Sequence, residues 1–137
     1  PMKQARRLIS LILLIGFSLG LLAGCAAKLP EGYDEAVVKS EADKVIMVLD
    51  ARDVDQLTAM LTDQMKLGLT EEVKAQVFAI LDDFGPVQEI VEMKTTGSTE
   101  GEITYGVVVA RVKHANGELT YTISFDPQMR LAGLFLQ

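Results

Sequence analysis

ITYGVVVARVKHANGELTYTISF, residues 103–125, is the stretch of the sequence that decides the fold. Apolar and polar side chains alternate on both sides of Asn116-Gly117, a dipeptide that is typical of a two-residue hairpin turn. If this dipeptide forms the turn, Ala115 faces Glu118 in the predicted register. One face of the hairpin is then apolar and the other largely polar, as expected for an antiparallel sheet that is covered on one side.

The predicted register assigns each side chain of the hairpin to one of two faces. The core-facing set is apolar and comprises Val108, Ala110, Val112, Leu119, Tyr121, Ile123 and Phe125. The opposite set is mostly polar and comprises Val109, Arg111, Lys113, Thr120, Thr122 and Ser124. The two predicted strands are Ile103–Lys113 and Glu118–Phe125.

Two more predicted strands complete a four-stranded antiparallel meander. Val87–Lys94 precedes a polar stretch, Thr95–Gly101 (TTGSTEG), which we expect to be a loop. Arg130–Leu136 follows a turn at Asp126–Met129. Alternation along this last strand places Ala132, Leu134 and Leu136 on the core face, and Leu131 and Phe135 on the opposite face.

The region before the strands has the apolar spacing of helices. The recurring apolar positions are Val38, Ala42, Val45, Ile46 and Leu49, then Val54, Leu57 and Leu61, and then Val73, Val77, Ile80, Leu81 and Phe84. Leu67-Gly68-Leu69 interrupts the pattern, Thr70 is a candidate N-cap, and Gly85-Pro86 ends the last helix. The sequence therefore predicts an α+β domain in which about three helices pack on one face of the meander.

The first 24 residues have the composition of an export signal. Lys3, Arg6 and Arg7 give a basic start, and residues 1–24 contain no acidic side chain. The apolar run from Leu8 to Leu22 is 15 residues long. A membrane-spanning helix needs about 20 apolar residues, whereas the apolar region of a secretory signal has about 7–15. The run therefore favours a signal peptide.

The run ends in Leu22-Ala23-Gly24-Cys25, which resembles the lipobox of bacterial lipoproteins. The resemblance implies cleavage between Gly24 and Cys25 and a diacylglyceryl group on the Cys25 sulfur. Two acyl chains on one residue give a stable membrane anchor. The alternatives are a plain signal peptide or an uncleaved anchor with an incidental cysteine. We expect a protein of the cell membrane that is lipid-anchored on its extracytoplasmic face.

Cleavage at this point divides the chain into three parts: a signal peptide (1–24), a lipidated cysteine with a short tether (25–32), and an α+β domain (33–137). The mature chain has 10 basic and 19 acidic side chains, a net charge of −9 against −6 for the whole sequence. A nucleic-acid binder normally has a basic surface, so nucleic acid is not an expected partner. The negative charge also favours a domain held off anionic lipid head groups.

The sequence contains no convincing catalytic or metal-binding set. His114 is the single histidine, and at the end of a hairpin strand we interpret it as a solvated turn residue in preference to a general base. One His and one Cys exclude a Cys/His zinc cluster. Asp50, Asp53 and Asp55 lack the glycine and the closing acid of a calcium loop. We expect no metal, no cofactor and no enzymatic activity.

Three further stretches resemble a family of bacterial extracytoplasmic domains of unknown function. They are Asp50-Ala51-Arg52-Asp53-Val54, then Leu81…Phe84-Gly85-Pro86-Val87, and then Tyr121–Asp126 with Leu131-Ala132-Gly133-Leu134. Members of that family occur alone in lipoproteins or ahead of an α/β-hydrolase domain. The order of the elements is also similar to the cystatin-like and nuclear-transport-factor-2-like folds. The family carries no agreed catalytic residues, so the resemblance implies a fold but no activity.

Two hypotheses for function follow. The first is a non-catalytic binding or protein-interaction module, with a homodimer or another envelope protein as partner; its candidate interaction face comprises Val109, Arg111, Thr120, Thr122, Leu131 and Phe135. The second is a small enzyme or a carrier of apolar ligands that uses a cavity between helices and sheet. For that cavity Tyr121 is the candidate pocket residue, although a core tyrosine is the favoured interpretation.

Overall fold

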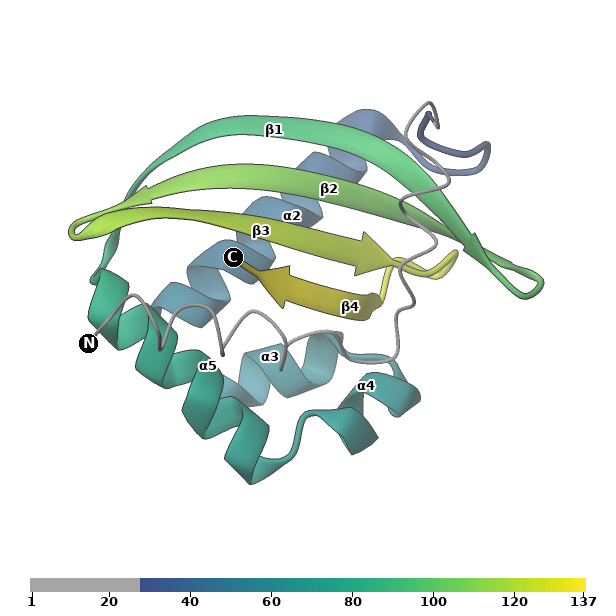
Figure 1. Ribbon diagram of the computed structural model, residues 1–137. Coiled ribbons are helices and arrows are strands. Elements are labelled where there is room, and N and C mark those ends of the chain that lie inside the picture. The colour runs from purple at the N-terminus through teal and green to yellow at the C-terminus, as the bar shows by residue number, and fades with distance from the viewer. Residues whose placement is uncertain (1–27) are drawn as a thin grey trace.

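The computed structural model describes residues 28–137, which form helices followed by a curved antiparallel sheet (Figure 1). The predicted signal peptide, the lipobox and Cys25 lie outside the described residues. The described helices are α2 (Glu35–Asp50), α3 (Val54–Met60), α4 (Asp63–Gly68) and α5 (Glu71–Phe84). The strands are β1 (Val87–Glu100), β2 (Ile103–His114), β3 (Gly117–Phe125) and β4 (Leu131–Leu136).

Each described helix begins at a side chain that caps its free backbone N–H groups. The capping residues are Asp34, Asp53, Thr62 and Thr70. The Thr70 side chain accepts a hydrogen bond of 3.2 Å from the N–H of Val73, as the sequence predicts. The caps at Asp53 and Thr62 divide the second predicted helix into two short ones. Residues 28–137 therefore contain one helix more than expected.

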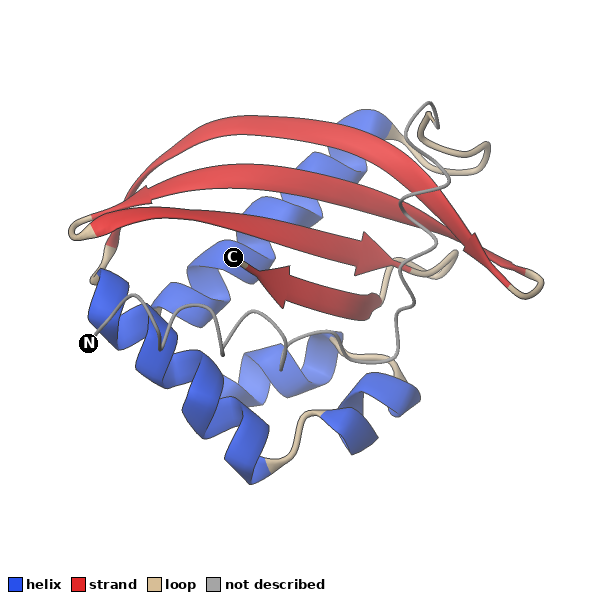
Figure 2. Ribbon diagram, in the orientation of Figure 1, coloured by secondary structure: helices blue, strands red, loops and turns tan. Residues whose placement is uncertain are grey.

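The strands form a meander with the order β1-β2-β3-β4, and the helices lie on one side of it (Figure 2). The prediction of an α+β fold is thus confirmed. Helix α2 crosses the sheet beneath β1 and β2, and α5 packs against β3 (Figure 1). The apolar positions of the predicted helical stripes are buried, apart from Val54 and Val73. None of the helices among residues 28–137 is long and apolar enough to cross a membrane.

The predicted loop Thr95–Gly101 is wrong, because β1 continues to Glu100. Residues 95–100 pair with residues 103–108 of β2, which leaves only Gly101 and Glu102 for the turn. Threonine is a good strand former, and polar side chains do not prevent pairing when they face solvent. Polarity alone therefore gave a misleading prediction for this stretch.

The hairpin register differs from the prediction, although its two faces are as predicted. Lys113 pairs with Glu118 and His114 with Gly117, so that Ala115 and Asn116 form the turn. The shift is two residues, which preserves the alternation, and the predicted core-facing set is buried. The turn is fixed by the end of α5, since the Asn116 N–H donates to the Phe84 carbonyl oxygen at 2.8 Å.

A β-bulge moves Leu131 into the core, and its predicted outward position is wrong. Phe125 pairs with Leu131 whereas Ser124 pairs with Gly133, so Ala132 is the extra residue. An extra residue reverses the alternation on one side of the bulge. Leu131 is 1 % exposed, while Phe135 pairs with Thr122 and is half-buried on the outer face, as predicted.

Candidate functional site

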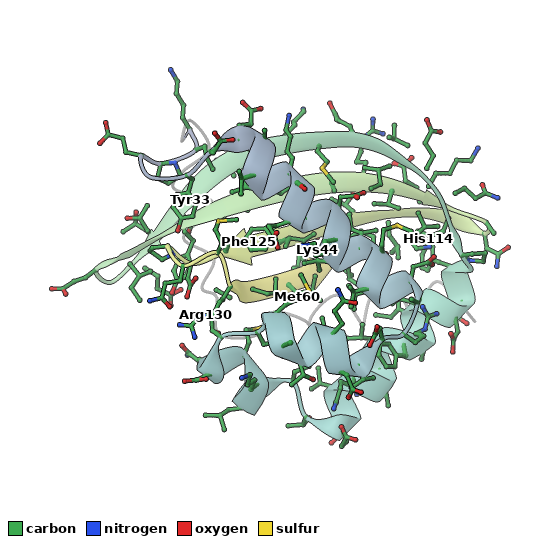
Figure 3. All side chains as sticks on the ribbon, turned by 180° about the vertical axis from the view of Figure 1, so that it is seen from behind. Tyr33, Lys44, Met60, His114, Phe125 and Arg130 are labelled. Atoms are coloured by element: carbon green, nitrogen blue, oxygen red, sulfur yellow. The ribbon has the colours of Figure 1, made fainter. Side chains whose placement is uncertain are left out.

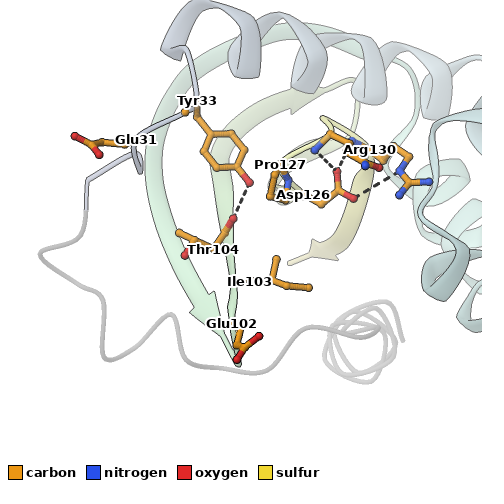
Figure 4. A pocket seen from close by; sticks show the side chains of 10 residues that line it. Glu31, Tyr33, Glu102, Ile103, Thr104, Asp126, Pro127 and Arg130 are labelled. Atoms are coloured by element: carbon orange, nitrogen blue, oxygen red, sulfur yellow. Dashed lines mark hydrogen bonds and ion pairs between the residues drawn. The ribbon is translucent and has the colours of Figure 1, made fainter.

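A cleft of about 520 Å³ lies at the end of the sheet where the described chain enters the domain (Figure 4). Three segments that are distant in sequence line it: residues 31–33 before α2, residues 102–104 at the start of β2, and residues around the β3–β4 turn. The turn contributes Asp126, Pro127, Gln128 and Arg130. The cleft is therefore a product of the tertiary fold.

Tyr33 forms one wall of the cleft and ties the entering chain to the sheet. Its hydroxyl donates to the Thr104 carbonyl oxygen at 2.7 Å and lies 3.1 Å from that of Phe125 (Figure 4). Its ring lies against Gly106, where a Cβ atom would come within 2.7 Å of the Tyr33 Cδ1 atom. Burial raises the pKa of Tyr33 above its ordinary value, so the side chain acts as a neutral donor.

Asp126 organises the opposite wall. One carboxylate oxygen accepts the N–H groups of Gln128, at 3.0 Å, and Arg130, at 2.9 Å. The other lies 3.6 Å from Nε of Arg130. These contacts hold the β3–β4 turn, in which Met129 adopts a positive φ of 62°. The carboxylate of Asp126 is thus used mainly to shape the turn.

The cleft has more acidic than basic side chains. Its lining includes three acidic side chains and one basic side chain: Glu31, Glu102 and Asp126, and Arg130. Burial, and secondly the nearby carboxylates of Glu100 and Asp126, raise the pKa of Tyr105. The lining offers hydrogen-bond acceptors and an aromatic wall, but its residues contain no nucleophile paired with a base. Chemically, such a surface can bind a ligand but has no evident means of transforming it.

His114 lies at the other end of the sheet and is buried (Figure 3). Its Nδ1 atom is 2.7 Å from the Gly85 carbonyl oxygen, and its Nε2 atom is 2.9 Å from the Tyr121 hydroxyl. A carbonyl only accepts, which assigns the proton to Nδ1 and makes Nε2 the acceptor for Tyr121. The prediction of a solvated turn residue is wrong: His114 has the parity of the core face in both the predicted and the actual register, and Phe84 packs edge-on against it.

Tyr121 is fully buried on the core face, as the alternation predicts, and does not line the cleft. Burial raises its pKa well above the ordinary range; the charge of Asp50 adds to this effect and that of Arg52 opposes it. Its hydroxyl is bonded to His114. The side chain therefore serves the interior of the domain, and its role as a ligand-pocket residue finds no support in this geometry.

The predicted interaction face is present on the outer side of the sheet, except for Leu131. Val109, Thr122 and Phe135 form one row across three strands, and all three are half-buried. Thr120 lies beside Arg111 in the next row. The Arg111 guanidinium lies between Glu92 and Glu118, with nitrogen–oxygen distances of 3.1 and 3.2 Å.

Two of the three aspartates considered for calcium have structural roles, and the third, Asp55, lies in the first turn of α3. Asp50 accepts a hydrogen bond of 3.0 Å from the N–H of Val87, and Asp53 caps α3. Within residues 28–137, no group of three or more His, Cys, Asp or Glu side chains is placed to hold a metal ion.

The cleft itself was missed at the level of sequence. Asp126-Pro127 marks the turn that supplies one wall, but nothing local to Tyr33 indicates that its ring lies on Gly106. That contact joins residues 73 positions apart. The glycine is the one available signal, because an apolar strand interior without a side chain often marks a close approach of another group.

Comparison with known proteins supports both the fold and the family. A solved structure, the NMR structure of a protein from Ruminococcus gnavus ATCC 29149, matches with a TM-score of 0.71 and 27 % identity, covering 79 % of this chain and 95 % of that one. No curated protein matches the chain. Residues 42–134 match a family described as "Protein of unknown function (DUF3887)". The match spans more than half of the sequence, and the chain therefore belongs to the DUF3887 family.

Proposed function

We propose that the protein is a membrane-anchored lipoprotein whose domain is a small non-catalytic binding or protein-interaction module on the extracytoplasmic face. The proposed lipid anchor is supported by the sequence Leu22-Ala23-Gly24-Cys25, which directly follows an apolar run of signal-peptide length. The family to which the chain belongs has no assigned activity. The anchor is thus the most specific functional feature of the sequence.

The use of the domain for binding is supported by where its polar groups lie. His114 and Tyr121 bond to each other and to Gly85 in the interior, so neither offers a free group to a substrate. At the opposite end, Tyr33, Glu102 and Arg130 line a cleft that is open to solvent. An exposed cleft with fixed walls suits recognition.

The alternative of a small enzyme or apolar-ligand carrier requires an open space between helices and sheet. The side chains that border that region are buried and belong to one packed cluster: Leu81, Phe84, Leu119, Tyr121 and Ile123. The cleft, with its carboxylates, is a poor match for an apolar ligand. The geometry therefore favours the interaction module.

Labelling of Cys25 tests the anchor. Cells that express the full chain are grown with a palmitate analogue, and the protein is isolated and assayed for label. Wild type should take up the label and sediment with membranes, whereas Cys25→Ala should do neither. Equal labelling of the two forms would reject the lipoprotein assignment.

For the module, we propose as partner a second copy or another envelope protein, bound by the row Val109–Thr122–Phe135 on the outer face of the sheet. Apolar side chains bordered by charged ones, here Arg111 with Glu92 and Glu118, are common in protein interfaces. Light scattering on the detergent-solubilised protein with Phe135→Glu tests self-association, and Lys113→Glu on the same face is the matched control. A monomer that Phe135→Glu leaves unchanged would exclude the homodimer and leave the envelope protein as the proposed partner.

We also propose kinship of this fold with the cystatin-like and nuclear-transport-factor-2-like folds. The proposal rests on the long helix α2 crossing a curved four-stranded meander (Figure 1). A superposition on representatives of both folds that failed to align α2 together with all four strands would reject it. The association of some relatives with a hydrolase domain stays a prediction from the family resemblance.

A further inference from the structure

We propose that the domain stands upright on the membrane, with the cleft end facing the lipid head groups, because the tether is docked on the sheet. The proposal rests on the lipid anchor at Cys25 proposed above. It concerns residues 28–33, which the sequence assigns to a short tether and the start of the domain, and the sheet surface that receives them. If the proposal holds, the cleft has a fixed orientation relative to the membrane surface.

Two glycines opposite each other in β1 and β2 provide the docking surface. Gly97 pairs with Gly106 across the two strands, and both face the helix side of the sheet. A Cβ atom at Gly97 would lie 2.8 Å from the Lys28 carbonyl oxygen and 2.8 Å from Cγ of Pro30. The missing side chains are therefore what allows the entering chain to approach the sheet backbone.

The docked segment is also held by specific contacts. Leu29 packs against the hydrophobic core, and the Tyr33 ring covers Gly106. The Tyr33 hydroxyl donates to the Thr104 carbonyl oxygen on β2. Residues from Lys28 onward thus belong to the folded body. In the sequence, only Ala26 and Ala27 separate Lys28 from Cys25.

Chain length then limits where the anchor can lie. Cys25 is three Cα–Cα steps from Lys28, which is about 10 Å at most. From Gly106 to His114, β2 runs eight residues away from the docking surface, or about 25 Å along the strand. The anchor can therefore hold the cleft end at the membrane, and the turn at Ala115 comes near the bilayer only if the domain lies flat.

Charge opposes the flat arrangement, which would bring the carboxylates of a whole sheet or helix face to the lipids. The upright arrangement brings only the cleft end, with Glu31, Glu102 and Asp126, and the covalent anchor holds that end in place. The mature chain has a net charge of −9, and the outer sheet face and the helices both carry exposed carboxylates, among them Glu89, Glu118 and Asp82. Repulsion from anionic lipids pushes the body away while the covalent anchor retains one end. The cleft then faces ligands that are carried at the membrane surface.

Cysteine accessibility in spheroplasts tests this orientation. Cys25 is the single cysteine of the sequence and is blocked once acylated, so an introduced cysteine is the single reactive thiol of the chain. Glu102→Cys places a thiol at the exposed β1–β2 turn and Ala115→Cys places one at the exposed β2–β3 turn. Each full-length variant is treated with a bulky maleimide-polyethylene glycol, and the rate of modification is followed by gel shift.

We expect modification at position 102 to be several-fold slower than at position 115 on the membrane, and the two rates to become equal after detergent solubilisation. Adding Tyr33→Ala should release the tether and remove the difference, while Tyr33→Phe, which keeps the ring on Gly106, should largely preserve it. Equal rates on the membrane, whether both fast or both slow, would overturn the proposal.

A failure of the anchor itself is recognised separately. Protein that is not lipidated fails to sediment with the spheroplast membranes and takes up no palmitate analogue. Only variants that pass both assays are compared for orientation, so a failure of the anchor is distinguished from a failure of the orientation.

Discussion

The two ends of the sheet place their polar groups in opposite ways. At the hairpin end, His114 and Tyr121 are buried, and their ring nitrogens and hydroxyl bond to each other and to Gly85. At the end where the chain enters, Asp126 and Arg130 line an open cleft (Figure 4). The polar groups at the hairpin end are buried and bonded to one another, whereas those at the cleft end are accessible to solvent.

This difference separates stability from recognition. A buried hydroxyl or imidazole must keep its partner, because an unpaired polar group in the interior is costly. Groups at an open cleft exchange their partners with water and can therefore bind a ligand. The comparison predicts large effects on stability for substitutions of the buried polar side chains at the hairpin end, and small effects for substitutions of exposed polar side chains that line the cleft.

The largest expected effect comes from Tyr121→Ala at the hairpin end. Removing a fully buried aromatic side chain leaves a cavity, and we expect a loss of about 3–5 kcal/mol in the free energy of unfolding, measured by urea denaturation. Tyr121→Phe keeps the ring but leaves Nε2 of His114 without a donor, which should cost about 1–3 kcal/mol. If neither variant changed the free energy of unfolding, Tyr121 would not be buried and bonded to His114 as described.

Gly106→Ala at the cleft end should cost about 1–3 kcal/mol, because the new methyl group collides with the Tyr33 ring. The double variant with Tyr33→Ala tests the cause. If the ring is the obstacle, the penalty of Gly106→Ala becomes smaller in the Tyr33→Ala background. An additive pair would contradict the docking of Tyr33 on this glycine.

Alkaline pH should destabilise the domain, in part through Tyr121 at the hairpin end. The pKa of Tyr121 is raised above its ordinary value of 10.0, so the unfolded chain releases this proton at a lower pH than the folded one. The stabilisation is complete below pH 10 and declines above it, by about 1.4 kcal/mol per pH unit. Urea denaturation as a function of pH should show a shallower decline for Tyr121→Phe. Parallel curves would argue against a buried Tyr121.

The smallest effect is expected for Arg130→Ala at the cleft. The ion pair of Arg130 with Asp126 is long, at 3.6 Å, and its Arg130 side chain is exposed; surface pairs of this kind contribute about 0–1 kcal/mol. Unfolding at low and high salt concentrations should give nearly the same difference from wild type. A loss as large as that of Tyr121→Phe would show that the two ends do not differ as proposed.

Much of the sheet was predictable because strand alternation is local. The identities of Val108, Ala110 and Val112 on the core face follow from a period of two, and a register error of two residues leaves them there. Leu131 was misplaced because a bulge at Ala132 has no clear local signal. His114 was misjudged because its place at the end of a strand suggested exposure to solvent, whereas the alternation already put it on the core face and Phe84 packs against it.

The sequence by itself determined the helices before the strands and the two faces of the central hairpin, and it alone predicts the export signal with its cysteine. All three depend on side chains that are neighbours along the chain. Only the tertiary structure decided the turn at Ala115-Asn116, the inward position of Leu131, and the cleft with its docked Tyr33. Each of these depends on contacts between segments far apart in sequence. In such contacts the backbone of one segment forms hydrogen bonds with another segment or leaves room for its side chains.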